Sequence, residues 1–144
     1  MSAGQARANS WASSFVIREI LEEARTVAIV GISDNPARPS YGVARFLIES
    51  GYRVVGVNPN IDEVLGTLCY PSLTDVPEPI DVVNVFRRSE AVNGLINQMI
   101  KLRIPYLWFQ EGVVDVNVAD RAAEAGIKVV MDRCLAKELT RLRF

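Results

Sequence analysis

Glycine, serine and arginine residues follow the first predicted strand in an order that could bind an anion. Residues 27–30 form a short, continuous apolar run, as expected of a strand that is buried on both faces. Gly31 permits a sharp exit from this strand, and a helix is predicted to begin near Ser40. Backbone N–H groups at the start of a helix can meet a phosphate group, and Arg38 could add a bidentate contact. The segment therefore predicts a phosphate-binding turn, although Arg38 could also be an ordinary solvated loop charge.

This turn lacks the glycine pattern of a dinucleotide-binding enzyme. A Gly-x-Gly-x-x-Gly fingerprint beginning at Gly31 would require glycine in place of Ser33 and Pro36. After the second predicted strand, Asn58 and Pro59 stand where such enzymes carry an acidic residue for the ribose. They are suited instead to a neutral wall against adenine or ribose, or they simply end the strand.

The next strand ends in an aromatic residue and two arginines. Phe86, Arg87 and Arg88 are suited to an anion, or to an aromatic ring stacked on a guanidinium group. The alternative is that the arginines pair with acids such as Glu90. We expect at least one of the two arginines to contact a ligand.

A glutamine and a glycine close the strand after that. We expect Gln110 and Gly112 to line a cleft, and Trp108 to lie in the core rather than to serve as a platform for a cofactor. Glu111 has the chemistry of a general base, but a single glutamate without a partner is weak evidence for catalysis.

The chain contains no histidine and two cysteines, which restricts its chemistry. Ser-His and Cys-His nucleophile pairs are excluded, as are nearly all zinc sites with nitrogen ligands, and we expect no metal. Cys134 follows the last predicted core strand near a possible helix start, where a thiol could have a lowered pKa. The alternative is an inert, half-buried thiol. These features favour a binding protein over an enzyme.

Strands and helices alternate along the chain, which predicts a single Rossmann-like, doubly wound parallel α/β sheet with right-handed crossovers. We predict about five main strands, at 27–32, 52–57, 80–86, 104–109 and 127–131, and a short edge strand at 68–70. Helices are predicted at 13–24, 41–50, 115–125 and 135–142, with a further helix that Ser89 caps and that runs through Ile100. Ligands bind such sheets beyond the carboxyl ends of the strands, where the strand order reverses, so the polar segments above should lie together.

Length and composition are those of one domain. The chain has 144 residues, of which 49% are hydrophobic, and a net charge of −1. We expect a flexible tail at 1–12 and a domain at 13–144. No basic stripe predicts binding to nucleic acid, and no apolar stretch reaches the roughly 18 residues that would span a membrane. Sparse cysteines and an N-terminus without a hydrophobic segment predict a cytoplasmic location.

Four stretches of the chain resemble the small, stand-alone CoA-binding domain proteins. They are VAIVGISDNPARPSYGVARFLIESGYRVVGVNPN (27–60), CYPSLTDVPEPIDVVNVFRRSEAV (69–92), WFQEGVV (108–114) and AGIKVVMDRCLAKEL (125–139). The resemblance covers about residues 13–140. This family is similar in fold to the CoA-binding domain of the succinyl-CoA synthetase alpha subunit. The resemblance therefore implies a Rossmann-like fold with a CoA site at the strand ends.

The resemblance also implies which residues contact the coenzyme. They would be Gly31, Ser33, Arg38, Ser40 and Gly42 in the first turn, Asn58 and Pro59 after the second strand, and Phe86 and Arg87 after the strand at 80–86. It implies no reaction, because members of this kind lack the phosphohistidine of the synthetase and this chain has no histidine.

We therefore predict a protein that binds CoA or an acyl-CoA through its ADP and 3′-phosphate moiety, without evident catalysis. Two alternatives remain: an NAD(P)-linked or acyl-CoA-transforming enzyme that uses Glu111 or Cys134, and a regulatory interaction domain with a vestigial nucleotide site. If the pantetheine arm runs toward the last strands, Cys134 could form a mixed disulfide with CoA under oxidation. Intact mass after incubation with CoA disulfide tests this hypothesis, and a missing reductant-sensitive adduct on Cys134 would refute it. Protein partners are not predicted.

Overall fold

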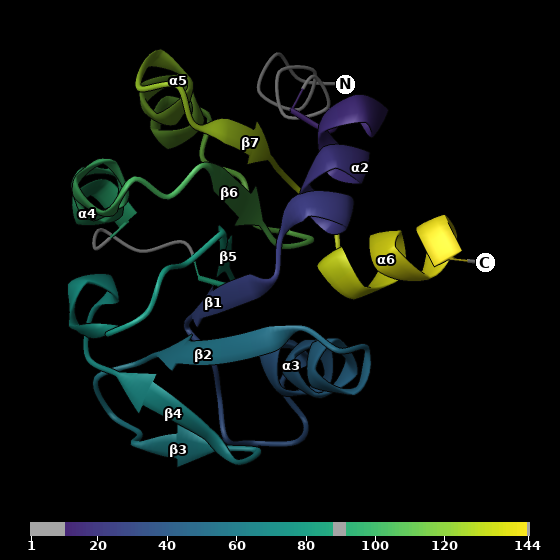
Figure 1. Ribbon diagram of the computed structural model, residues 1–144, viewed down its shortest axis with the longest axis vertical. Coiled ribbons are helices and arrows are strands. Elements are labelled where there is room, and N and C mark those ends of the chain that lie inside the picture. Colours follow the sequence, from purple (N-terminus) through teal and green to yellow (C-terminus); the bar gives the residue numbers. More distant parts are fainter. Residues whose placement is uncertain (1–10, 88–91, 144) are drawn as a thin grey trace.

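A central sheet organises the protein in the computed structural model, which describes residues 11–87 and 92–143 (Figure 1). Within these residues the sheet has seven strands in the order β3-β4-β2-β1-β5-β6-β7. All neighbouring strands are parallel except β3 and β4. The strands are β1 (Thr26–Val30), β2 (Arg53–Val57), β3 (Glu63–Val64), β4 (Thr67–Tyr70), β5 (Val82–Val85), β6 (Tyr106–Phe109) and β7 (Lys128–Val130). Because β1 lies between β2 and β5, the strand order reverses there.

Helices cover both faces of this sheet, so the predicted doubly wound α/β class is confirmed (Figure 1). One face carries α2 (Ser14–Glu23), α3 (Pro39–Glu49) and α6 (Leu135–Arg143). The other carries α4 (Val92–Leu102), α5 (Val116–Glu124) and the short 3-10 helix η1 (Leu73–Asp75).

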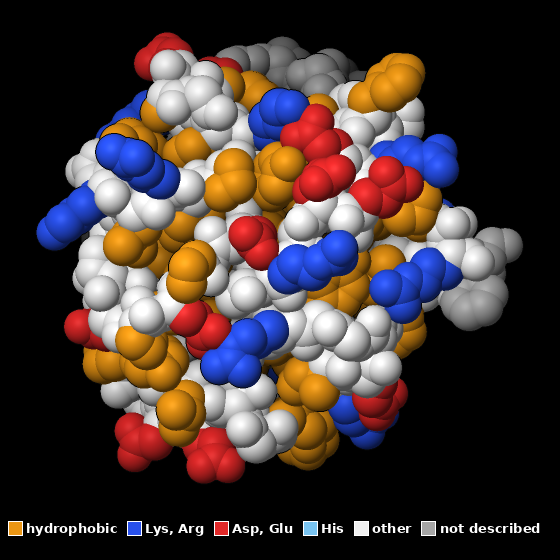
Figure 2. Space-filling model, viewed as in Figure 1, with side chains coloured by type: hydrophobic (Ala, Val, Ile, Leu, Met, Phe, Trp, Pro, Cys, Tyr) orange, Lys and Arg blue, Asp and Glu red, His pale blue; other side chains and the backbone are white. Residues whose placement is uncertain are grey.

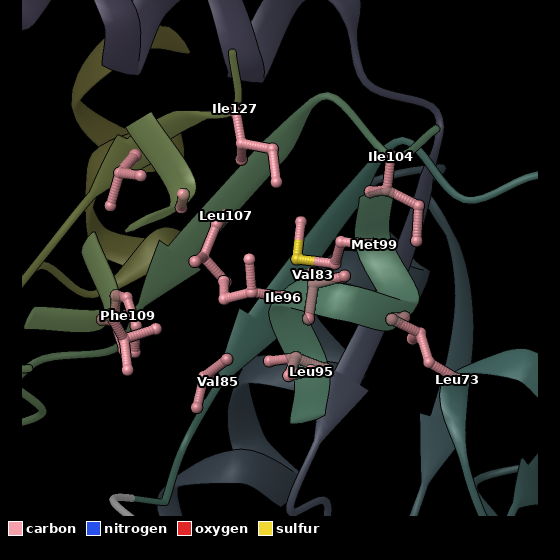
Figure 3. Close-up of a cluster of buried hydrophobic side chains, with 14 of the residues drawn as sticks. Leu73, Val83, Val85, Leu95, Ile96, Met99, Ile104, Leu107, Phe109 and Ile127 are labelled. Carbon is pink, nitrogen blue, oxygen red and sulfur yellow. The ribbon is translucent and has the colours of Figure 1, made fainter. Parts of the chain in front are cut away.

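Alternation along each strand sends side chains into two separate hydrophobic clusters. In β1, Val27 and Ile29 face α2, α3 and α6, whereas Ala28 faces the opposite cluster. Figure 3 shows that second cluster, in which Ile96 and Met99 of α4 pack over the strands. Both side chains are almost fully buried, and each such burial stabilises the fold by roughly 1.5–3 kcal/mol.

The strand register brings four strand ends to the same edge. Val30 at the end of β1 is paired with Val57 of β2 and with Val85 of β5, and Val85 is paired with Phe109 of β6. The segments that follow these strands therefore emerge side by side. These are the segments in which ligand contacts are expected from the sequence.

The sheet has more strands than the sequence predicted. The short strand expected at 68–70 exists as β4, but it is not the edge of the sheet, because β3 pairs with its outer side. Leu65 and Gly66 join β3 to β4, and both have positive φ values, 55° and 73°, as in a type I′ hairpin turn. A strand of two residues is too short for alternation to reveal it in the sequence.

Some sequence predictions fall on residues outside the described ranges. These are positions 1–10 of the expected tail, Arg88, and Ser89 as a helix cap. Trp11 packs against the sheet, and its carbonyl accepts a hydrogen bond of 2.9 Å from the N–H of Met131.

Charge and metal-ligand patterns of the surface are unremarkable. Basic and acidic side chains are interspersed on the face shown in Figure 2. Among the described residues, no three His, Cys, Asp or Glu side chains are placed so that they could hold a metal ion. No helix within the described ranges is long and apolar enough to cross a bilayer.

Candidate ligand-binding site

Gly31 makes the turn at the end of β1. Its φ is +87°, a backbone conformation that residues with a Cβ rarely adopt, and its N–H donates to the carbonyl of Val57 at 3.1 Å. A Cβ on Gly31 would lie 3.0 Å from Cγ of Arg87. The aliphatic part of Arg87 therefore packs directly over the bare backbone of this turn.

The loop from β1 to α3 is held by its own side chains. The hydroxyl of Ser40 accepts from the N–H of Ser33 at 3.0 Å, and that of Ser33 accepts from the N–H of Asn35 at 3.1 Å. Asn35 in turn accepts from the N–H of Ala37 at 3.0 Å. These three hydrogen bonds fix the shape of the loop, and Ser40 is buried.

α3 begins at Pro39, close to the predicted start. Arg38 is the residue before its first turn, and its side chain makes no capping hydrogen bond there. Pro39 has no N–H group, and the N–H of Tyr41 donates to the carbonyl of Arg38 at 3.1 Å. The first turn of a helix carries partial positive charge, and the exposed Arg38 adds a full charge beside it. This end of α3 is therefore electrostatically suited to an anion.

Asn58 uses both ends of its side chain to fix the turn after β2. Its Nδ2 donates to the carbonyl of Ile32 at 2.8 Å, and its Oδ1 accepts from the N–H of Asn60 at 2.8 Å. The turn after β2 is thereby tied to the turn after β1. Asn58 shapes the site, and its carboxamide is already engaged.

Gln110 at the end of β6 is almost completely buried, and its orientation is fixed. Its Oε1 accepts from the N–H of Leu135 at 3.4 Å and from Nδ2 of Asn84 at 3.5 Å. Asn84 is itself oriented by the carbonyl of Trp108, to which Nδ2 donates at 3.2 Å. The carbonyl of Trp108 and the N–H of Leu135 therefore fix the orientation of both carboxamides. Nε2 of Gln110 takes part in none of these hydrogen bonds, so it is the atom that remains for a ligand.

The neighbouring residues after β6 and β7 are engaged with each other. Glu111 is exposed and forms an ion pair of 3.0 Å with Lys137. The N–H of Gly112 donates to Oδ1 of Asp132 at 2.7 Å. Trp108 is fully buried, as the sequence predicted, and its Nε1 donates to the carbonyl of Arg133 at 2.8 Å.

Two hollows open at this edge of the sheet. The first, here called the cleft, has a volume of about 350 Å³ and is lined by Gly31, Ser33, Arg38, Pro39, Ser40, Phe86, Arg87, Gln110 and Glu111. The second, here called the slot, has a volume of about 400 Å³ and is lined by Val30, Gly31, Val57, Asn58, Pro59, Asn60, Pro71, Ser72, Leu73, Arg87, Leu95 and Gln98. The cleft takes its residues from the α3 side of the sheet and the slot from the η1 and α4 side. Gly31 and Arg87 line both, so the two hollows meet there.

Most of the predicted site residues line these hollows. Those lining the cleft are Gly31, Ser33, Arg38, Ser40, Phe86, Arg87 and Gln110, and Asn58 and Pro59 line the slot. Cys134 is 9% exposed and lines a third hollow, which shares Glu111 with the cleft. Gly42 on α3 and Gly112 line neither the cleft nor the slot, and Arg88 is outside the described residues.

The far wall of the slot was not predicted from the sequence. Pro71 and Leu73 belong to the irregular stretch before β5, where no periodic pattern identifies a site. Gln98, in contrast, could have been identified from the sequence. It lies one turn after Leu95 on α4, so a carboxamide stands at helical spacing within an otherwise apolar face.

Fold and site together define a Rossmann-like α/β domain with an elongated hollow at the switch point of its sheet. The chain belongs to the CoA binding domain family, which it matches over residues 25–140.

Relatives of known sequence and structure support this assignment. The chain is 40% identical to the uncharacterized protein YneT of Bacillus subtilis over 119 residues, 83% of this chain and 88% of YneT. The structure of a hypothetical protein from Pyrococcus horikoshii matches with a TM-score of 0.87 at 38% identity, and covers 92% of this chain and 93% of that protein. An ADP-forming acetate–CoA ligase of Archaeoglobus fulgidus is 33% identical over 60 residues, which are 40% of this chain but 9% of the ligase.

Proposed function

We propose that this protein binds CoA or an acyl-CoA across the carboxyl edge of its sheet and holds it without transforming it. The observation that carries the proposal is the meeting of cleft and slot at Gly31 and Arg87. An elongated ligand with a diphosphate near its middle suits two hollows that join at a positive-φ glycine and a guanidinium group. Membership of the CoA binding domain family supports the same ligand.

The residues around the hollows fit the chemical groups of CoA. Arg38, Arg87 and the uncapped start of α3 supply positive charge for phosphates. The slot is lined largely by apolar side chains with a few amides, which suits a flat base or an amide-bearing arm. The combined volume lies in the usual range of small-molecule sites, roughly 300–1,000 Å³.

The acidic residue that lines the cleft is poorly suited to catalysis, which favours binding without a reaction. Glu111 is the acidic residue among those lining the cleft, and it is exposed and paired with Lys137. A general base must lie within hydrogen-bond reach of the proton that it abstracts, whereas the carboxylate of Glu111 lies 3.0 Å from the ammonium group of Lys137. The sequence offers no histidine for the same task.

Calorimetric titration with CoA, dephospho-CoA, acetyl-CoA and NAD in parallel tests the proposal. We expect CoA to bind more tightly than dephospho-CoA, since an arginine would contact the 3′-phosphate. Arg38→Ala or Arg87→Ala should narrow that difference. Arg45→Ala is the matched control, because Arg45 is an exposed arginine on α3 that lines neither hollow.

Each other result has a definite meaning. Equal affinity for CoA and dephospho-CoA would remove the assignment of an arginine to the 3′-phosphate. Tight binding of NAD would favour a dinucleotide-dependent enzyme. No binding of any of the four compounds would overturn the proposal and favour an interaction domain.

A further inference from the structure

A glutamine that lines the slot has a buried oxygen atom without a hydrogen-bond partner. Among the described residues, two buried side-chain oxygens are in this position: Oδ1 of Asn84 and Oε1 of Gln98. Asn84 lies within the sheet, on β5, whereas Gln98 lines the slot. A buried polar atom that stays unpaired costs about 1–3 kcal/mol, so a rotation of the Gln98 carboxamide that brings Oε1 to a ligand donor in the slot would be favourable.

The rest of the slot limits what that donor can belong to. Pro71 and Leu73 on one side and Leu95 of α4 on the other give it apolar walls, and Leu73 is fully buried. Asn58 has both ends of its carboxamide engaged. Arg87, at the junction with the cleft, is the one charged residue among those lining the slot. The slot therefore suits a neutral, largely apolar group that offers an N–H donor.

We propose that Gln98 recognises the adenine base of the bound coenzyme, an inference that rests on the proposed function. The exocyclic amino group of adenine is an N–H donor on a flat, neutral ring, which matches both the unpaired Oε1 and the apolar walls. A glutamine carboxamide can also donate to an adjacent ring nitrogen of the same base, as in its bidentate pairing with adenine in nucleic acids. The phosphates then lie where the two hollows meet, near Arg87 and Arg38, and the pantetheine arm extends along the rest of the cleft.

The pantetheine arm is the competing occupant of the slot, because it too carries amide N–H donors. Replacing the base separates the two arrangements. Hypoxanthine has a carbonyl oxygen where adenine has the amino group, and this oxygen would face Oε1 of Gln98 as a second acceptor. If the pantetheine arm occupied the slot, replacing adenine with hypoxanthine would leave the contacts of Gln98 unchanged.

The experiment compares CoA with its hypoxanthine analogue by calorimetry on the wild type and two variants. The wild type should prefer CoA by about tenfold, the value of roughly one buried hydrogen bond. Gln98→Leu keeps the size of the side chain and should abolish the preference. Asn97→Leu should retain it, because Asn97 is the exposed amide next to Gln98 and does not line the slot.

Three results would count against the inference. Tight CoA binding with no base preference in the wild type refutes the role of Gln98 and leaves the proposed function intact. A preference that survives in Gln98→Leu assigns adenine to another residue. No CoA binding by the wild type removes both the inference and the proposed function.

If Gln98→Leu does not fold, a measurement on the wild type decides. The side-chain NH₂ resonances of Gln98 should shift in NMR spectra on addition of adenosine 3′,5′-bisphosphate. They should shift little on addition of 4′-phosphopantetheine. The reverse pattern would place the arm in the slot and overturn the inference.

Discussion

Replacing Gly31 with alanine tests the geometry on which the binding site depends. The φ of +87° costs an alanine about 1–2 kcal/mol, since its Cβ crowds the following carbonyl. The new methyl group would also lie 3.0 Å from Cγ and 3.3 Å from Cδ of Arg87. The side chain of Arg87 is flexible and can move by a few tenths of an ångström, but that movement shifts the guanidinium group shared by cleft and slot.

Gly126→Ala separates the two effects. Gly126 has a φ of +84° but open space around its missing Cβ, and it lies after α5, away from the strand ends of the site. The backbone conformation alone should cost both variants about 1–2 kcal/mol of the free energy of unfolding, and Gly31→Ala should lose more than Gly126→Ala because its methyl group meets Arg87. Gly31→Ala alone should also weaken CoA binding by about tenfold, or about 1.4 kcal/mol.

Urea unfolding and calorimetry measure the two quantities separately. In an Arg87→Ala background, Gly31→Ala should cost less stability than in the wild type, because the side chain that the methyl group meets has been removed. If Gly31→Ala binds CoA as tightly as the wild type, the turn at Gly31 does not lie against the ligand and the reasoning is wrong.

Two further predictions concern the scaffold. At Gly56 in β2, a methyl group would overlap Sγ of Cys69. Gly56→Ala should therefore lower the free energy of unfolding in urea by about 1–3 kcal/mol, and Cys69→Ala should recover part of this loss. If Gly56→Ala costs the same with and without the Cys69 thiol, the overlap is disproved. Hydrogen bonds from Lys128 and Tyr106 lower the pKa of Glu19 below its ordinary value of 4.5. The ionised carboxylate therefore stabilises the fold above that value and this stabilisation is lost as the pH falls. Glu19→Gln should flatten the decrease in stability below pH 4.5, and an unchanged acid profile would show that Glu19 contributes nothing.

The main features of the fold follow from local sequence signals. Continuous apolar runs identified β1, β2, β5, β6 and β7, and helical spacing placed α3 and α6 to within about two residues of the predicted ends. A strand covered on both faces is apolar throughout, and a helix covered on one face has apolar residues at helical spacing. Both patterns can be read within a short stretch of sequence. β3 was missed because two residues carry no period, and its pairing with β4 depends on the turn at Leu65 and Gly66.

The site was predictable to the extent that it follows from strand ends. Gly31, Arg87 and Gln110 come within two residues of the ends of parallel strands, so topology alone brings them to one edge. Gln98 comes from the middle of a helix, and only packing of α4 against η1 brings it to the slot. Which polar side chains are already engaged was also beyond reach, because the bond from Asn58 to Ile32 joins residues from two different turns.

Polar side chains around the site fall into two groups with different expected effects. Asn58, Ser33 and Ser40 hydrogen-bond to backbone groups and hold the turns, whereas Arg38 is exposed beside the cleft. Asn58→Ala removes two hydrogen bonds and should lower the free energy of unfolding by about 1–3 kcal/mol. It should also weaken CoA binding, because the turn that Asn58 holds lines the slot. Arg38→Ala should change stability by less than about 0.5 kcal/mol and still weaken binding. If Asn58→Ala left stability unchanged and reduced binding alone, Asn58 would be a ligand contact, and the turns would owe their shape to other bonds.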